Sequence, residues 1–357
     1  MTVADVGTPG RLLNGPAAHQ RIGIGCRSIT PSGPHASADD ERFLEGLRRA
    51  VARGATVLAT ADAFGLGRSE RLIGELLREV PRHQVSIVGS VGGFRGTAPH
   101  AYATPHLHHQ VRQSLENLGT DYLDVLSLYG TDFGKDNCYL PDAAATVHAL
   151  RDEGLIRAVG LRLPPKSEPR QRDQGGRQTA ALIEELMPDS LCVRYNAVTA
   201  DTLVDGEDVF SYARRHRIAL MLGEPFARGL LTGHYRAGDR LSRAGSGRLR
   251  MKTRHQDALP LLDNALQLLR DRLGGDPNAL IRAALHYSLR RIGADGVVLA
   301  GFACPDHIET NLTAAASPLA DDDLAFVIQL YDQLRADWTK HPTGSHLGHD
   351  EARQQHP

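Results

Sequence analysis

Residues 57–70 read VLATADAFGLGRSE, and this stretch indicates the fold. Its apolar first half predicts a buried strand at Thr56–Thr60, and the leucines and isoleucine that follow have helical spacing. The same alternation of strand and helix continues along the chain. Eight short apolar runs are separated by helical stretches: Arg21–Gly25, Thr56–Thr60, Val85–Gly89, Asp124–Leu128, Ala158–Leu161, Ser190–Tyr195, Ala219–Gly223 and Gly296–Ala300. This pattern predicts an α/β protein, a (β/α)8 barrel.

The chain of 357 residues is long enough for one such barrel, which takes roughly 250 residues or more. We expect a flexible or hairpin segment at 1–20, the barrel at 21–335 and a polar, His-rich tail at 336–357. The formal net charge of −1 gives no electrostatic reason to expect nucleic acid as a partner. No apolar run reaches the roughly 20 residues that span a membrane. No signal peptide is recognised, and no two of the cysteines form a CxxC pair, which together predict a cytoplasmic protein. The oligomeric state stays open.

Several segments together resemble the aldo-keto reductase family over about residues 20–330. Residues 57–70 are similar to the family signature DTA-x-x-YG-x-G-x-SE. Further similar segments are SLENLGTDYLD at 114–124, EGLIRAVG at 153–160, YN at 195–196 and ARGLLTG at 227–233. The resemblance implies an aldo-keto reductase type of barrel, whose active site lies at the carboxyl ends of the strands. It also implies reduction of a carbonyl group with NADP(H).

Four positions where the resemblance implies catalytic Asp, Tyr, Lys and His hold other residues: Ala59, Phe64, Ser90 and Tyr129. Reduction of a carbonyl group needs a proton donor beside the carbonyl oxygen, and a neighbouring cation makes that donor effective. Phe64 has no proton to donate, and Ser90 carries no positive charge. Tyr129 has a hydroxyl, but we expect it to lack a cationic neighbour. We therefore expect that standard reduction has been lost.

The positions where the resemblance implies cofactor contacts are changed as well. Arg162 and Leu163 replace a Ser-Asn pair, and Cys192 replaces a glutamine. Glu224 lies where the family has a serine for the pyrophosphate, and a carboxylate repels a pyrophosphate unless it is neutralised. We therefore expect no cofactor, with weak or absent binding of NADP(H), and no metal ion.

The predicted strand ends gather polar side chains that suggest a replacement chemistry: Arg27, Asp62, Tyr129, Arg162, Arg194, Tyr195 and Glu224. The planar fork of arginine suits a carboxylate or a phosphate. We expect Arg27, Arg162, Arg194 and Tyr195 to bind a small anionic molecule. Tyr129, Glu224 and Asp62 are then the candidate acid–base groups. The alternative is that each arginine pairs with a nearby carboxylate.

Three functions stay open. The preferred one is a non-redox enzyme, a dehydratase, isomerase or cyclase, that acts on a small anionic or polyhydroxylated metabolite without NADP(H). The second is a catalytically inactive binding or regulatory protein. The third is a divergent NADP(H)-dependent oxidoreductase that takes its proton from Tyr129 or from the substrate. The roles of the histidines at 100–109 and of the basic segment at 240–254 also stay open.

Overall fold

Eight parallel strands close into a barrel in the computed structural model, which describes residues 21–29, 36–165, 179–234, 258–274, 276, 278–292 and 296–340. Their order around the barrel is β1-β10-β9-β6-β5-β4-β3-β2. The strands are β1 (Ile22–Gly25), β2 (Val57–Ala61), β3 (Ser86–Val91), β4 (Leu123–Leu128), β5 (Ile156–Arg162), β6 (Ser190–Arg194), β9 (Ala219–Gly223) and β10 (Gly296–Gly301). The predicted (β/α)8 barrel is therefore confirmed, and each predicted strand overlaps an observed one.

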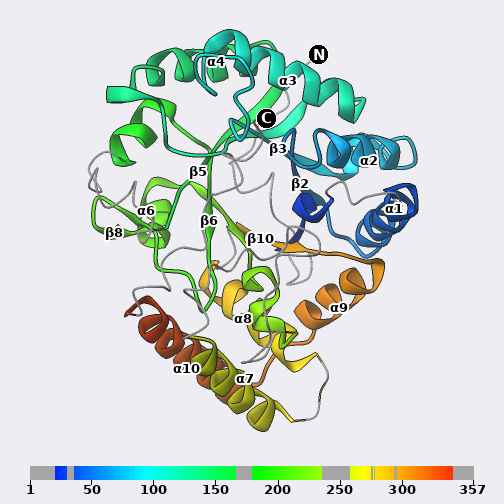
Figure 1. Cartoon of the computed structure of the whole chain (residues 1–357), viewed down its shortest axis with the longest axis vertical. Helices are drawn as coiled ribbons and strands as arrows, with labels where there is room; N and C mark the ends of the chain where they lie inside the picture. The colour runs from blue at the N-terminus through cyan, green and yellow to red at the C-terminus, as the bar shows by residue number, and fades with distance from the viewer. Residues whose placement is uncertain are drawn as a thin grey trace.

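Helices surround the barrel on its outer side (Figure 1). They are α1 (Ala36–Ala52), α2 (Arg68–Leu76), α3 (Thr104–Leu118), α4 (Leu140–Asp152), α6 (Val209–His216), α7 (Leu259–Leu273), α8 (Ala279–Ile292), α9 (Pro305–Ala316) and α10 (Asp321–Lys340). Residues 179–186 form a further helix, and β7 (Leu203–Val204) pairs with β8 (Glu207–Asp208) as a small hairpin. Short 3₁₀ segments are η3 (Cys26–Ser28), η5 (Arg82–Gln84), η6 (Lys135–Asn137) and η7 (Ala227–Thr232). Helix α10 extends beyond 336, where we expected the tail to start. Residues 1–20 and 341–357 lie outside the described residues.

The barrel interior is a small apolar layer contributed by alternate positions of the strands. Its buried members are Val57, Val88, Val125, Ala158, Ala219, Met221 and Val297. Side chains of a strand alternate between its two faces, so every second residue after these also faces the interior. This rule places Ser90 and Arg162 on the inner face at the carboxyl ends of their strands. It also places Arg194 there, because Cys192, two residues earlier in β6, packs against the same layer. The polar site is therefore a consequence of strand register.

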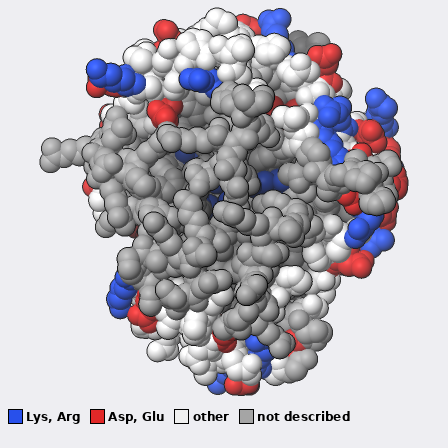
Figure 2. All heavy atoms as spheres, viewed as in Figure 1, with Lys and Arg blue, Asp and Glu red and all other residues white. Residues whose placement is uncertain are grey.

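The outer surface carries charges of both signs. Figure 2 shows acidic and basic side chains interspersed around the edge of the visible face. None of the described helices combines the length and the apolar character needed to cross a membrane.

Candidate active site

Tyr129 lies at the carboxyl end of β4, between two arginine side chains. Arg27, in η3 after β1, donates from Nη1 to the Tyr129 hydroxyl at 2.6 Å. The guanidinium carbon of Arg162 lies 4.7 Å from the centre of the Tyr129 ring. Burial alone raises the pKa of Tyr129, but the charges of Arg162 and Arg27 outweigh it and bring the pKa below its usual value of 10.0. The expectation that Tyr129 lacks a cationic neighbour is therefore wrong.

Glu224 follows β9 and lies among arginine side chains. Its carboxylate is 3.8 Å from Arg162 Nη2 and 3.4 Å from Arg228 Nε. Burial alone raises the pKa of Glu224, but the charges of Arg228, Arg194 and Arg162 hold it at about 2. So acidic a carboxyl group is a weak base at neutral pH. Glu224 therefore suits the role of a fixed counter-ion better than that of an acid–base group.

Several arginine side chains act on Glu224 at this end of the barrel. Among the described residues, four guanidinium groups, those of Arg27, Arg162, Arg194 and Arg228, act on the single carboxylate of Glu224. Arg194 is buried, which lowers its pKa to about 10, so it still carries its charge at neutral pH. Glu224 is therefore shared by several guanidinium groups and is not the partner of one arginine alone.

The backbone after β9 adopts unusual conformations to hold this arrangement. Glu224, Ala227 and Arg228 have φ angles of 59°, 48° and 60°, in the left-handed region. Each such residue costs of the order of 1–3 kcal/mol, and such strain tends to cluster at functional sites. The carbonyl of Glu224 accepts hydrogen bonds from Asn196 Nδ2 and from the N–H of Ala227, both at 2.9 Å. These two bonds hold the backbone carbonyl of Glu224 in place.

Asp62 follows β2 and forms hydrogen bonds away from the arginine cluster. Its Oδ1 accepts from the N–H of Ala63, and its Oδ2 accepts from Gln110 Nε2, both at 2.6 Å. Burial raises the pKa of Asp62 to about 6, although both hydrogen bonds oppose this. The acid–base role of Asp62 stays a prediction, with a pKa near the neutral range that suits it.

Tyr195 is not brought together with the other candidate residues. It is one position beyond Arg194, so its side chain faces outward, toward the helices. Its ring stacks on Tyr287 of α8 at 5.0 Å and meets the edge of Phe210 at 5.1 Å. Arg335 of α10 lies 5.2 Å from the ring centre. This packing explains the burial of Tyr195 without a ligand.

The three other positions of the implied catalytic set lie at the same end of the barrel. Ala59 is beside the interior apolar layer, and Ser90 pairs in register with Ala61 of β2. The guanidinium carbon of Arg27 lies 5.9 Å from the centre of the Phe64 ring. Tyr129 therefore stands where the resemblance implies a histidine, and the guanidinium groups of Arg27 and Arg162 both contact it.

The histidines expected in the loop after the third strand lie mostly on a helix. His106, His108 and His109 belong to α3, whereas His100 precedes it and stacks on Tyr139 at 4.4 Å. Among the described residues, no three His, Cys, Asp or Glu side chains gather as metal ligands. The basic segment at 240–254 lies outside the described residues.

Tyr102 also contributes to the candidate active site, although the sequence did not indicate it. Its buried hydroxyl donates to the carbonyl of Gly130 and accepts from the N–H of the same residue, both at 2.9 Å. Its ring lies against Gly92, which has a φ of 91°, and a Cβ there would come within 2.1 Å of the ring. Tyr102 thus holds the peptide next to Tyr129. No local pattern in the sequence marks a contact of this kind.

Replacing Tyr102 by Phe should destabilise the fold by about 1–3 kcal/mol, because both groups of Gly130 lose their partner. Thermal unfolding of the variant measures this loss. Tyr139→Phe is the matched control. The rings of Tyr102 and Tyr139 both lie close to His100, but the Tyr139 hydroxyl makes no hydrogen bond to a described residue. Equal melting temperatures for the Tyr102→Phe and Tyr139→Phe variants would show that the hydrogen bonds between Tyr102 and Gly130 do not stabilise the fold.

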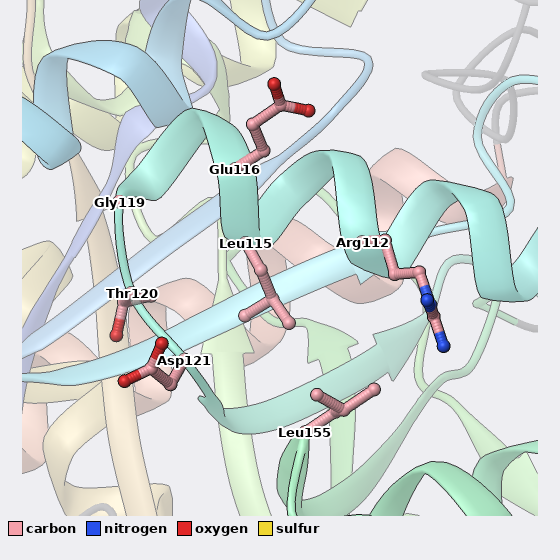
Figure 3. A pocket seen from close by; sticks show the side chains of 7 residues that line it. All are labelled: Arg112, Leu115, Glu116, Gly119, Thr120, Asp121 and Leu155. Atoms are coloured by element: carbon pink, nitrogen blue, oxygen red, sulfur yellow. The ribbon is translucent and has the colours of Figure 1, made fainter.

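A shallow hollow of about 410 Å³ lies at the opposite end of the barrel (Figure 3). The end of α3 and the residues that precede β4 and β5 form it, including Leu115, Asp121 and Leu155. It is remote from the carboxyl ends of the strands, where barrels of this type place their active sites. The arginine cluster around Tyr129 therefore remains the candidate active site.

The sequence model of the aldo/keto reductase family matches residues 21–332. The chain belongs to the aldo-keto reductase family. It is 26% identical over 297 residues to the aldo-keto reductase YhdN of Bacillus subtilis (strain 168), which covers 81% of this chain and 83% of YhdN. Among solved structures it is similar to a glycerol dehydrogenase, AKR11B4 from Gluconobacter oxydans, with a TM-score of 0.67, 19% identity and coverage of 90% and 92% of the two chains. It is also similar to an aldo/keto reductase from Klebsiella pneumoniae in complex with NADP and acetate, with a TM-score of 0.59, 20% identity and coverage of 87% and 91%.

These relatives overturn two expectations. The aldo-keto reductase family members found by comparison are named as reductases and a dehydrogenase, and the Klebsiella structure contains NADP. The expectations of a non-redox enzyme and of a site without NADP(H) are therefore wrong, and nothing found supports an inactive binding protein. The changed residues at 59, 64, 90 and 129 do not by themselves show that redox chemistry is lost. Of the three functions left open, the divergent oxidoreductase is the one that the relatives favour.

Proposed function

We propose that the protein is a nicotinamide-dependent oxidoreductase that interconverts a small carbonyl compound and its alcohol. Tyr129 is its proton donor. The observation that carries this proposal is the hydroxyl of Tyr129 at 2.6 Å from Arg27 Nη1, with the guanidinium of Arg162 over the same ring. A phenol beside fixed cations is the arrangement that carbonyl reduction requires. Arg27, which follows β1, and Arg162 of β5 thus supply the positive charge that the resemblance led us to expect from a lysine on β3.

The residues divide the reaction between them. When bound, the dinucleotide supplies the hydride that reaches the carbonyl carbon. Tyr129 donates its hydroxyl proton to the carbonyl oxygen as negative charge develops there. Arg27 remains hydrogen-bonded to the phenolate oxygen that results, and the charge of Arg162 stabilises the same phenolate. In the reverse direction, the phenolate takes the proton of the alcohol.

The residues after β9 and β10 fit a dinucleotide. The repulsion expected from Glu224 is reduced, because the charges of Arg228, Arg194 and Arg162 act on this carboxylate. Arg228, whose Nε lies 3.4 Å from Glu224, would also attract a pyrophosphate. Helix α9 begins at Pro305 with no hydrogen bond from the Cys304 side chain to its first turn, and the start of a helix attracts a phosphate. Arg228 and the start of α9 are the groups that would hold it.

We propose further that the substrate carries an anionic group, most simply a carboxylate. The gathering of guanidinium groups at the strand ends supports this, since the charges of Arg27, Arg162 and Arg194 all act on Glu224. An arginine fork binds a carboxylate through paired hydrogen bonds. A neutral substrate of the same size would gain no such charge-assisted hydrogen bonds.

Oxidation of NADPH and NADH in the presence of paired carbonyl compounds tests both proposals. Each pair consists of an aldehyde or ketone with a carboxylate and its neutral analogue of equal size. We expect turnover, with kcat/KM about tenfold or more higher for the acid, which corresponds to about 1.4 kcal/mol. No oxidation of either nucleotide with any member would contradict the redox function. Equal kcat/KM within all pairs would contradict the anionic substrate alone.

A further inference from the structure

Helices α2 and α3 lie side by side (Figure 1), and a cluster of buried polar side chains lies between them. Glu70 of α2 is fully buried, and Asn117 Nδ2 of α3 donates to its Oε2 at 2.8 Å. Gln110 is on the same face of α3, two helical turns before Asn117, and Ser114 lies between them. The helices approach closely here, since a Cβ on Gly74 of α2 would lie 2.7 Å from the carbonyl oxygen of Asn117.

Gln110 connects this cluster to the mouth of the barrel. Its Nε2 donates to Asp62 Oδ2 at 2.6 Å and to the carbonyl of Phe94 at 3.1 Å. Asp62 follows β2 and Phe94 follows β3, so Gln110 joins two loops at the carboxyl ends of the strands. Ala63, next to Asp62, and Tyr129 both flank Gly93. The amide of Gln110 thus helps to position the wall of the site.

Three buried atoms of the cluster have no partner with hydrogen-bond geometry among the described residues, namely Glu70 Oε1, Gln110 Oε1 and Ser114 Oγ, although the Ser114 hydroxyl is near enough to Glu70 to affect its carboxyl group. The amide and carboxylate oxygens both need a donor, and the hydroxyl of Ser114 supplies one proton. An ionised Glu70 therefore leaves one acceptor unpaired. A proton on Glu70 removes the deficit, because Glu70 then donates to Ser114 Oγ and Ser114 donates to Gln110 Oε1.

We propose that Glu70 is protonated in the folded protein and completes a hydrogen-bond chain from Asn117 through Glu70, Ser114 and Gln110 to Asp62. Glu70 is then a positioning residue for Asp62 and for the loop that carries Phe94. The groups around Glu70 favour its protonated form. Burial raises the pKa of Glu70 and the charge of Asp62 adds to the increase, whereas Asn117, Ser114 and the charge of Arg71 oppose it. This protonation does not depend on the redox function.

The sign of the pH dependence follows from these shifts. Below the usual glutamate pKa of 4.5, Glu70 is protonated in both the folded and the unfolded chain. As the pH rises above that value, the unfolded chain loses the proton first and gains stability relative to the folded protein. The wild type should therefore lose stability relative to Glu70→Gln as the pH rises from 4.5 through the folded pKa. The glutamine amide keeps a donor for Ser114 and an acceptor for Asn117.

Isotope-edited infrared spectroscopy on the full chain, with labelled glutamate carboxyl groups, tests the protonation. At neutral pH we expect the carbonyl band of a protonated carboxyl group, which Glu70→Gln removes. Glu75→Gln, at an exposed position of the same helix, should keep the band and the wild-type pH dependence of stability. A wild type without the band would overturn the proposal, as would a band that survives in Glu70→Gln.

The positioning role is tested by Ser114→Ala, which breaks the chain but leaves Glu70 in place. We expect the infrared band to shift, and the backbone around Phe94 to exchange its amide hydrogens several-fold faster than in the wild type. Glu70→Gln should keep wild-type exchange there, because its amide restores the chain. Unchanged exchange in Ser114→Ala would show that the cluster does not position the loop.

Discussion

Replacing Tyr129 by Phe is expected to lower kcat by about 10²–10⁴-fold and to leave KM within a few-fold of the wild-type value. The ring and its contact with Arg162 remain, so the variant loses the proton donor and the hydrogen bond from Arg27. Steady-state kinetics with NADPH and the best acidic carbonyl compound measure this effect. In the wild type, reduction should also decline on the alkaline side as Tyr129 deprotonates, at a pH below 10.0.

Tyr122→Phe is the matched control for this substitution. Tyr122 precedes β4, at the opposite end of the strand from Tyr129, where its ring lies 4.0 Å and 3.8 Å from the guanidinium carbons of Arg82 and Arg157. Its loss should leave kcat and the alkaline decline unchanged. A Tyr129→Phe variant with wild-type kcat would show that the proton comes from elsewhere, for example from the substrate itself.

The variant Arg162→Met should reduce kcat/KM for an acidic substrate by about 10- to 100-fold, which is the worth of a hydrogen bond to a charged group. The reduction should be smaller for the neutral analogue. The same substitution removes the largest charge that lowers the pKa of Tyr129, so the alkaline decline should move to higher pH. The pH dependence of kcat/KM for both substrates measures the two effects together.

Arg157→Met controls for the loss of an arginine from the same strand. Arg157 is near the start of β5, half exposed, and paired with Asp124 at 3.2 Å far from the site. The Arg157→Met substitution should change neither the preference for the acidic substrate nor the pH dependence of kcat/KM. An alkaline decline in Arg162→Met at the wild-type pH would contradict the cationic activation of Tyr129.

The barrel and much of the site could be predicted because both follow from period and register. The apolar runs predicted the eight strands within one or two residues, and strand ends indicated where polar groups gather. The direction of the Tyr195 side chain was harder to predict, because a residue one place beyond Arg194 faces the opposite side of the sheet. Its stacking on Tyr287 comes from a helix almost a hundred residues later in the chain.

What could not be predicted depends on contacts between distant segments. Arg27 and Arg162 meet Tyr129 from strands on either side of the barrel interior, so no local pattern showed that this phenol has cationic neighbours. The same holds for the neutralisation of Glu224 by Arg194 and Arg228. Judging each changed position by itself led to the wrong expectation of a site without a nicotinamide cofactor.

Titration of the purified protein with NADPH and NADH, followed by fluorescence and calorimetry, is the first test of the proposed cofactor. We expect saturable binding of at least one nucleotide in the micromolar range, about −8 kcal/mol, through Arg228 and the start of α9. We also expect that Arg228→Met weakens this binding. No binding of either nucleotide at millimolar concentration would contradict the proposed oxidoreductase function.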